Sequence, residues 1–171
     1  MAYTFSSEQT LSYPIEVVFA FFANPENLPR LMPQWQKARI EEASFTAPPP
    51  HPDPARRIKG IAAGAGTRLT MSFRPVPLSP IRLPWEAEIS EFVWNDHFCD
   101  VQLRGPFARW RHCHRLRTVA GGTLLRDEVE YEVPFGSLGR VAQPLIAFQL
   151  GATFRYRNTR TVELLGLMAG G

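Results

Sequence analysis

The segment WRHCHRLRTVAGGTLLRDEVEYEV, residues 110–133, decides the fold because its side chains alternate in character along two short stretches. Such alternation on both sides of a Gly-Gly pair is typical of a β-hairpin. Gly121 and Gly122 suit the positive φ angles of a tight turn. If Ala120 lies opposite Thr123, every other opposed pair in the two strands follows.

The two faces of this hairpin differ in chemistry. On one face arginines lie opposite glutamates, and this charge-matched face is expected to meet solvent. The two pairs are Arg111 with Glu132 and Arg115 with Glu128. Because alternate side chains of a strand point to the same side, the apolar and polar-aromatic residues share the other face. They are Trp110, His112, His114 and Leu116 on the first strand and Val133, Tyr131, Val129 and Asp127 on the second. We expect this second face to point inward.

The preceding hairpin, at residues 97–110, permits two registers. In one, Asp100 lies opposite His112 on the inward face. In the other, Asp100 pairs with Arg111 outside. We favour the first register because it gives a buried histidine a carboxylate partner. It also turns two further side chains inward, Phe98 opposite His114 and Gln102 opposite Trp110.

In the favoured register the two cysteines, Cys99 and Cys113, oppose each other on the outward face. They form neither a CxxC motif nor the spacing of a zinc site. The stretch MAYTFSSEQT, at the start of the sequence, has neither the basic nor the apolar region of a signal peptide, so we expect a cytoplasmic protein. A reducing cytosol would keep both cysteines as thiols, which argues against a redox function.

Length and composition indicate one globular domain spanning residues 1–171. The chain is 44% hydrophobic and only 20% charged, which argues against disorder. The net charge is +3, and 17 of the 19 basic residues are arginines dispersed along the chain. This dispersion argues against a nucleic-acid partner, which would need a basic patch. No window reaches the roughly 18 apolar residues of a membrane span.

The rest of the chain predicts strands and helices in a definite order. A strand at Tyr3–Leu11 precedes two short helices, one capped by Ser12 and one at Glu26–Leu31. Six strands follow, at 35–47, 67–74, 85–94, 97–103, 108–119 and 123–133. A long helix at Leu138–Leu167 contains Pro144, where we expect a kink or a restart. Its apolar face is expected to carry Leu145, Phe148, Leu150, Ala152 and Phe154.

Two connections are long and rich in proline. Pro48–Gly66 holds five prolines followed by three glycines. We expect this segment to be mobile and unpacked, with proteolysis beginning near Arg56 or Arg57. Residues 75–84 hold four prolines, which interrupt any sheet ladder.

The order of one strand, two short helices, six strands and a long helix resembles the helix-grip fold of the START-like superfamily, also called SRPBCC or Bet v 1-like. Four stretches are similar to its bacterial ligand-binding subgroup, whose members are often labelled polyketide cyclase/dehydrase-like or cell-division-inhibitor-like. They are FANPENLP at 22–29, DVQLRGPF at 100–107, WRHCH at 110–114 and DEVEYEVPFG at 127–136. The resemblance implies an α+β fold in which a seven-stranded antiparallel sheet curls around the C-terminal helix. Between sheet and helix it implies an elongated pocket for a hydrophobic small molecule.

We expect a polar cluster and the facing helix to line this pocket, with polar groups orienting a hydrophobic or aromatic ligand. The candidate ligand-binding residues are Trp85, Phe98, Asp100, Gln102, Trp110, His112, His114, Asp127, Tyr131, Leu145, Phe148 and Ala152. The leading hypothesis is a ligand-binding or carrier protein without a cofactor. Fold alone does not assign a reaction.

Two alternatives concern the same polar groups, and a third concerns the long helix. A cofactor-independent cyclase or dehydratase would use His112 or His114 to move a proton and Tyr131 to steady an enolate, with Asp127 beside them. A metal site of two histidines and one carboxylate is a less favoured alternative, and we predict none. Late in the long helix, Arg155, Arg157 and Arg160 read as a solvated face, the alternative being a carboxylate receptor at the pocket mouth.

Overall fold

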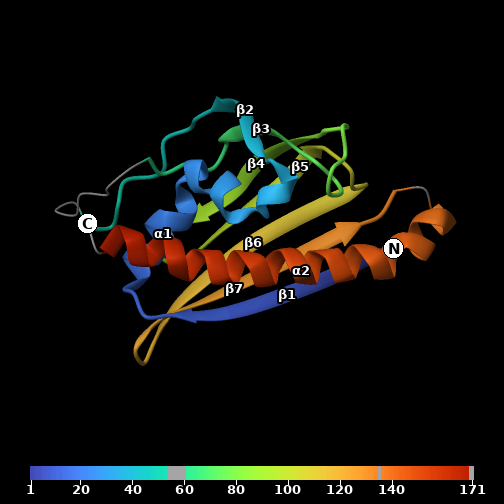
Figure 1. Cartoon of the computed structure of the whole chain (residues 1–171). Coiled ribbons are helices and arrows are strands. Elements are labelled where there is room, and N and C mark those ends of the chain that lie inside the picture. Colours follow the sequence, from blue (N-terminus) through green and yellow to red (C-terminus); the bar gives the residue numbers. More distant parts are fainter. Residues whose placement is uncertain (54–60, 135, 170–171) are drawn as a thin grey trace.

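The computed structural model describes residues 1–53, 61–134 and 136–169. These residues form one seven-stranded antiparallel sheet with the strand order β1-β7-β6-β5-β4-β3-β2, and a long helix, α2, lies across its face (Figure 1). The strands are β1 (Ala2–Leu11), β2 (Arg39–Ser44), β3 (Arg68–Phe73), β4 (Leu83–Val93), β5 (His97–Arg104), β6 (Arg109–Val119) and β7 (Gly122–Glu132). The helices are α1 (Ile15–Ala23) and α2 (Gly136–Ala169). The predicted α+β helix-grip architecture is confirmed.

The segment between α1 and β2 is less regular than predicted. Instead of a second short helix it forms three 3₁₀ turns, at Pro25–Asn27, Pro29–Leu31 and Gln34–Gln36. Each turn begins at or just after a proline, whose fixed φ suits the first position of a helix but interrupts a longer one. The strand predicted from residue 35 therefore begins only at Arg39. Nor does Ser12 cap α1, because the capping position is Pro14.

The register of β6 with β7 is shifted by two residues from the prediction. Val119 lies opposite Gly122, so Ala120 and Gly121 form the turn. Gly122 instead begins β7, where β1 comes so close that a Cβ atom would lie 2.0 Å from the carbonyl oxygen of Leu11. The second glycine is thus required by a neighbouring strand and not by the turn. Because the shift is even, every side chain stays on its predicted face.

Ion pairs on the outer face follow the corrected register. Arg115 pairs with Glu128 at 2.7 Å, as predicted, although the two are not directly opposed. Arg111 pairs with Glu91 at 2.8 Å and lies 3.8 Å from Glu130. The predicted Arg111–Glu132 pairing is wrong, because the shift brings Glu130 opposite Arg111.

The favoured register of β5 with β6 is confirmed. Asp100 lies opposite His112 and Phe98 lies opposite His114. Cys99 lies opposite Cys113 with their Cα atoms 4.1 Å apart, and a disulfide joins them. The expectation of free thiols is wrong. It rested on an assumed reducing compartment, whereas the register alone brings the two sulfurs together. Both cysteines are fully buried.

Helix α2 differs from the prediction in its phase. It runs without interruption through Pro144, so no restart occurs there. Leu145 and Phe148 are 68% and 70% exposed. Leu150 and Phe154 do pack against the sheet, as predicted, and Ile146, four residues before Leu150, packs beside them. None of the helices in the described ranges is long and apolar enough to cross a membrane.

The end of the proline-rich segment is packed, contrary to the expectation, and its start is tied by a hydrogen bond. Ala63 is 1% exposed, and its N–H donates to the carbonyl of Ala23 at 3.0 Å. The indole N–H of Trp94 donates to the carbonyl of Pro49 at 2.7 Å. Residues 54–60, which include Arg56 and Arg57, lie outside the described residues, so the expected cleavage site stays a prediction.

We predict that removing the cross-strand disulfide lowers stability without changing the fold. The bridge spans a sequence separation of 14 residues. Closing a loop of that length in the unfolded chain is worth about 3 kcal/mol in the chain-entropy model. Urea unfolding of a Cys99→Ala/Cys113→Ala variant should show a loss of up to this size. A reductant should destabilise the wild type and leave the variant unchanged; two alkylatable thiols in the native wild type would contradict the prediction.

Candidate functional site

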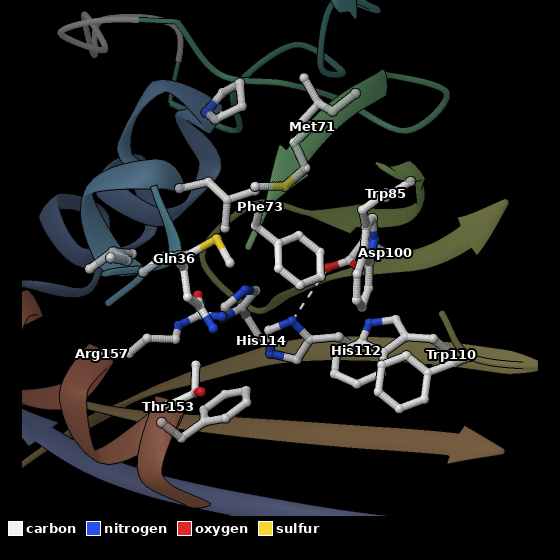
Figure 2. A pocket seen from close by; sticks show the side chains of 18 of the residues that line it. Gln36, Met71, Phe73, Trp85, Asp100, Trp110, His112, His114, Thr153 and Arg157 are labelled. Atoms are coloured by element: carbon white, nitrogen blue, oxygen red, sulfur yellow. Dashed lines mark ion pairs between the residues drawn. The ribbon is translucent and has the colours of Figure 1, made fainter. Parts of the chain in front are cut away.

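A cavity of about 350 Å³ lies between the sheet and α2 (Figure 2). Its walls come from α1, the 3₁₀ turns, strands β3 to β6 and one face of α2. Most lining side chains are apolar. The volume falls within the range of small-molecule sites.

Aromatic rings gather on one side of the cavity. The rings of Trp85 and Trp110 meet edge to face with centroids 5.0 Å apart. Phe107 lies 4.9 Å from Trp110, and Phe73 lies 6.0 Å from Trp85. β3, β4, β6 and the β5–β6 turn therefore supply one aromatic wall.

Two histidines and two carboxylates form the polar part of the site. His112 and His114 are two residues apart on β6, so both side chains point to the same side, with ring centroids 4.3 Å apart. They are 4% and 5% exposed. In Figure 2 they lie beside Asp100, whose Oδ1 is 3.4 Å from Nδ1 of His112.

Asp127, on β7, lies behind both histidines. Its Oδ1 accepts a hydrogen bond from Nε2 of His112 at 3.0 Å. The same oxygen lies 2.7 Å from Nδ1 of His114, although the approach is not aligned as a hydrogen bond. Asp127 is only 3% exposed, so its negative charge is balanced mainly by these two rings.

Burial and neighbouring charges separate the pKa values of these groups. Burial, reinforced by the charge of His112, lowers the pKa of His114 to about 4. For His112, burial is outweighed by contacts with Asp100 and Asp127, which raise its pKa above the usual value. Burial would raise the pKa of Asp127, but the two histidines hold it well below its usual range. At neutral pH this favours a neutral His114 and an ionised Asp127, and His112 holds a proton more readily than a free histidine does.

The structure brings together only part of the predicted ligand-binding set. Six of the predicted residues line the cavity, namely Trp85, Phe98, Asp100, Trp110, His112 and His114. Asp127 and Tyr131 are buried behind the lining, and the Tyr131 hydroxyl accepts a hydrogen bond from Gln143 at 3.3 Å. Gln102 instead closes the β5–β6 turn by bonding the backbone of Phe107.

The three predicted helix residues lie outside this lining. Leu145 and Phe148 point to solvent, and Ala152 borders a second pocket beside Trp35 and Tyr156. The helix contributes Ile146, Gln149, Leu150, Thr153, Phe154 and Arg157 to the cavity instead. The predicted face was too broad because apolar residues occur on both sides of this part of α2.

Two polar side chains of the lining were missed or rated low. Arg157 stacks over the ring of Phe154 at 4.9 Å, and within the described residues it has no ion pair or hydrogen bond. Oε1 of Gln36 is buried and lacks a hydrogen-bond partner among those residues. A helical phase anchored on Leu150 and Phe154 would have placed Arg157 on the inner face. We see no sequence signal that would have singled out Gln36.

The fold and its internal cavity define a helix-grip protein of the START-like, or SRPBCC, class. The model of the family "Polyketide cyclase / dehydrase and lipid transport" matches residues 11–155, most of the chain. The chain belongs to this family. None of the curated protein sequences matches it significantly.

Solved structures share the fold at low sequence identity. CV1439 from Chromobacterium violaceum is 15% identical with a TM-score of 0.67, over 95% of this chain and 96% of that chain. TTHA0849 from Thermus thermophilus is 16% identical with a TM-score of 0.62, over 95% and 99%. Norcoclaurine synthase from Thalictrum flavum, also solved with dopamine and hydroxybenzaldehyde, is 14% identical with TM-scores of 0.63 and 0.62, over 96% and 87%.

We predict that His114 stays neutral far below the pH at which a free histidine ionises. Its folded pKa of about 4 lies below the unfolded value of about 6.5. Between these two values the unfolded chain binds a proton at this ring that the folded chain does not bind. The neutral ring therefore contributes to folding stability at neutral pH, and this contribution is lost as the pH falls from 6.5 toward 4. NMR titration of the ring should give a midpoint near 4. A midpoint at or above 6.5 would contradict the assignment.

Proposed function

We propose that this protein binds a small amphipathic carboxylic acid in the cavity between the sheet and α2. This proposal rests on an apolar cavity lined by one guanidinium, that of Arg157, which has no ion pair or hydrogen bond among the described residues. The apolar body of the ligand would be aromatic or acyl. Binding and carriage, without a chemical step, are the function that these features support best.

The apolar lining supplies most of the binding free energy in this proposal. Burying one CH₂ group stabilises a complex by about 0.8 kcal/mol. The burial of a long apolar body therefore offsets the free energy that the ligand loses with its translational and rotational freedom. The rings of Phe73, Trp85, Phe107 and Trp110 offer an aromatic wall for that body. Shape and a few polar groups then set the orientation.

Arg157 and Gln36 give the ligand its polar end. Figure 2 places both, with Thr153 and His114, on the side of the cavity away from the tryptophans. Arg157 also helps lower the pKa of His114 by charge repulsion, so its guanidinium lies within electrostatic reach of that ring. A guanidinium recognises a carboxylate through paired donors. The orphan carbonyl of Gln36 would accept a hydrogen bond from a ligand hydroxyl or amide.

The family supports small-molecule binding in general terms. Its description includes lipid transport as well as cyclase and dehydrase chemistry. The norcoclaurine synthase structure with dopamine and hydroxybenzaldehyde illustrates that this fold accommodates aromatic molecules. The carboxylic acid is specific to the present proposal and rests on Arg157.

The charge requirement is tested with acids and their matched alcohols. Decanoate and cinnamate, with decanol and cinnamyl alcohol, are titrated while the fluorescence of Trp85 and Trp110 is followed. We expect each acid to bind about 10- to 100-fold more tightly than its alcohol, the value of a charge-assisted hydrogen bond. Arg157→Gln should remove this preference. Arg155→Gln, an exposed neighbour on the same helix, should keep it.

The location is tested by filling the cavity. Ala87→Phe introduces a ring into the lining on β4 and should abolish binding of all four probes. Ala152→Phe makes the same change on α2 outside this lining and should leave binding intact. Equal affinity for acids and alcohols in the wild type, or full binding by the folded Ala87→Phe variant, would contradict the proposal.

A cofactor-independent cyclase or dehydratase is the second candidate. It is favoured by one observation, a buried His112 held between two carboxylates at the cavity wall. A proton held there could be exchanged with a carbon beside a ligand carbonyl. Under this alternative His112→Gln abolishes deuterium exchange at that carbon in a bound β-keto acid but leaves its affinity unchanged. Under the carrier proposal the wild type catalyses no such exchange.

A further inference from the structure

We propose that Asp100, His112 and His114 form a site for a divalent first-row transition-metal ion on the wall of the cavity. One ring nitrogen of each histidine and one carboxylate oxygen of Asp100 lie within 4.8 Å of one another. The three residues come from the adjacent central strands β5 and β6. This inference reverses the sequence prediction of no metal site, because the structure brings the three ligand groups together. It goes beyond the binding of an organic acid and does not depend on it.

Asp127 prepares both histidines to act as ligands. It contacts Nε2 of His112 and Nδ1 of His114 with a single oxygen. With the Asp127 oxygen 3.0 Å from Nε2 of His112 and 2.7 Å from Nδ1 of His114, the nitrogens that neutral rings would offer to a metal ion are Nδ1 of His112 and Nε2 of His114. Metal-bound histidines commonly donate their other N–H to such a carboxylate, which fixes the tautomer and the ring orientation. Asp127 is therefore a positioning residue in this site.

The spacing between His112 and Asp100 fits two ligands of one ion better than it fits a hydrogen bond. Nδ1 and Oδ1 are 3.4 Å apart, beyond the usual range of such bonds. Two ligands at opposite ends of a tetrahedral edge, each about 2.0–2.1 Å from a zinc ion, lie about 3.4 Å apart. Among the described residues the ring of His114 makes no aligned hydrogen bond, and His114 lines the cavity.

The strand scaffold holds this arrangement rigidly. Asp100 and His112 are directly opposed, and the Cys99–Cys113 disulfide joins the adjacent pair on the other face of the sheet. A slip of β5 against β6 would separate the ligands, and the disulfide prevents it. Sites built on strands keep their geometry more precisely than sites on loops.

The donor set indicates the class of metal. Two imidazole nitrogens and one carboxylate oxygen suit zinc, iron or cobalt, whereas magnesium and calcium prefer oxygen ligands only. Three protein ligands leave a coordination position open, and the cavity is the space that it faces. A water molecule or an oxygen atom of a bound organic molecule would occupy that position.

The site is tested by calorimetric titration of chelator-treated protein with Zn²⁺. We expect one zinc ion per chain. Asp100→Asn is isosteric and removes a ligand charge, and we expect it to weaken binding by at least tenfold. Asp127→Asn should weaken binding about 10- to 100-fold, the usual effect of losing a carboxylate behind a ligating histidine. Asp96→Asn is the matched control, because Asp96 pairs with His97 on the surface, and it should bind as the wild type does.

A second readout in the wild type needs no variant. Zinc should shift the NMR ring signals of His112 and His114 at stoichiometric amounts and leave those of His51 and His97 in place. Absence of stoichiometric binding, ring shifts at His97 instead, or equal binding by folded Asp100→Asn would overturn the proposal. None of these results would bear on the acid-over-alcohol preference assigned to Arg157, so the two proposals fail separately.

Discussion

The pairing of β5 with β6 is the constraint on which the rest of the site depends. Opposed residues in these strands alternate between the two faces of the sheet, so one register controls both faces at once. It brings Asp100 against His112 on the cavity side and Cys99 against Cys113 on the other. A slip of β5 by one residue would turn Asp100 outward, away from His112, and Cys99 inward, away from Cys113. The disulfide on the outer face therefore fixes the same register that places Asp100 against His112 on the cavity side.

The buried carboxylate of Asp127 makes two histidines tolerable in this interior. An isolated buried charge is strongly unfavourable, and removing one partner of a buried ion pair typically costs about 3–5 kcal/mol. Asp127 avoids this penalty by contacting both rings, and Asp100 adds a second negative charge at the cavity surface. The result is a polar wall of defined charge beside an aromatic one. A ligand that is apolar along its body and polar at one end matches that asymmetry.

The strand pattern was predictable because period-two alternation survives an error in register. His112, His114 and Tyr131 lie on the predicted face although β7 is shifted by two residues. The shift itself was not predictable from the hairpin alone. Gly122 is required by the close approach of the β1 backbone, and β1 lies more than a hundred residues earlier in the chain. The disulfide was missed for a different reason. Its two cysteines were placed opposite each other correctly, but their oxidation state was taken from an assumed compartment.

For the long helix, the sequence predicts the element but not which of its faces packs against the sheet. Leu145, Phe148, Leu150 and Phe154 are spread around α2, so hydrophobicity alone did not determine its phase. Packing against the sheet determines which face of α2 is the inner one. Arg157 lies on that inner face and lines the cavity, whereas Phe148 is exposed. An arginine that the sequence places on a solvated face therefore lines the cavity. Whether a charged side chain of this helix faces the cavity or the solvent depends on how the helix is rotated about its axis, and packing against the sheet sets that rotation.

Native mass spectrometry of the protein purified from its own host tests the central claim most directly. The account predicts that the wild type carries a small molecule, released on denaturation and detected as a carboxylic acid with an aromatic or acyl body. The Ala87→Phe variant, purified in parallel, should carry none. A wild type without added mass, or the same added mass on the variant whose cavity is filled, would contradict the account.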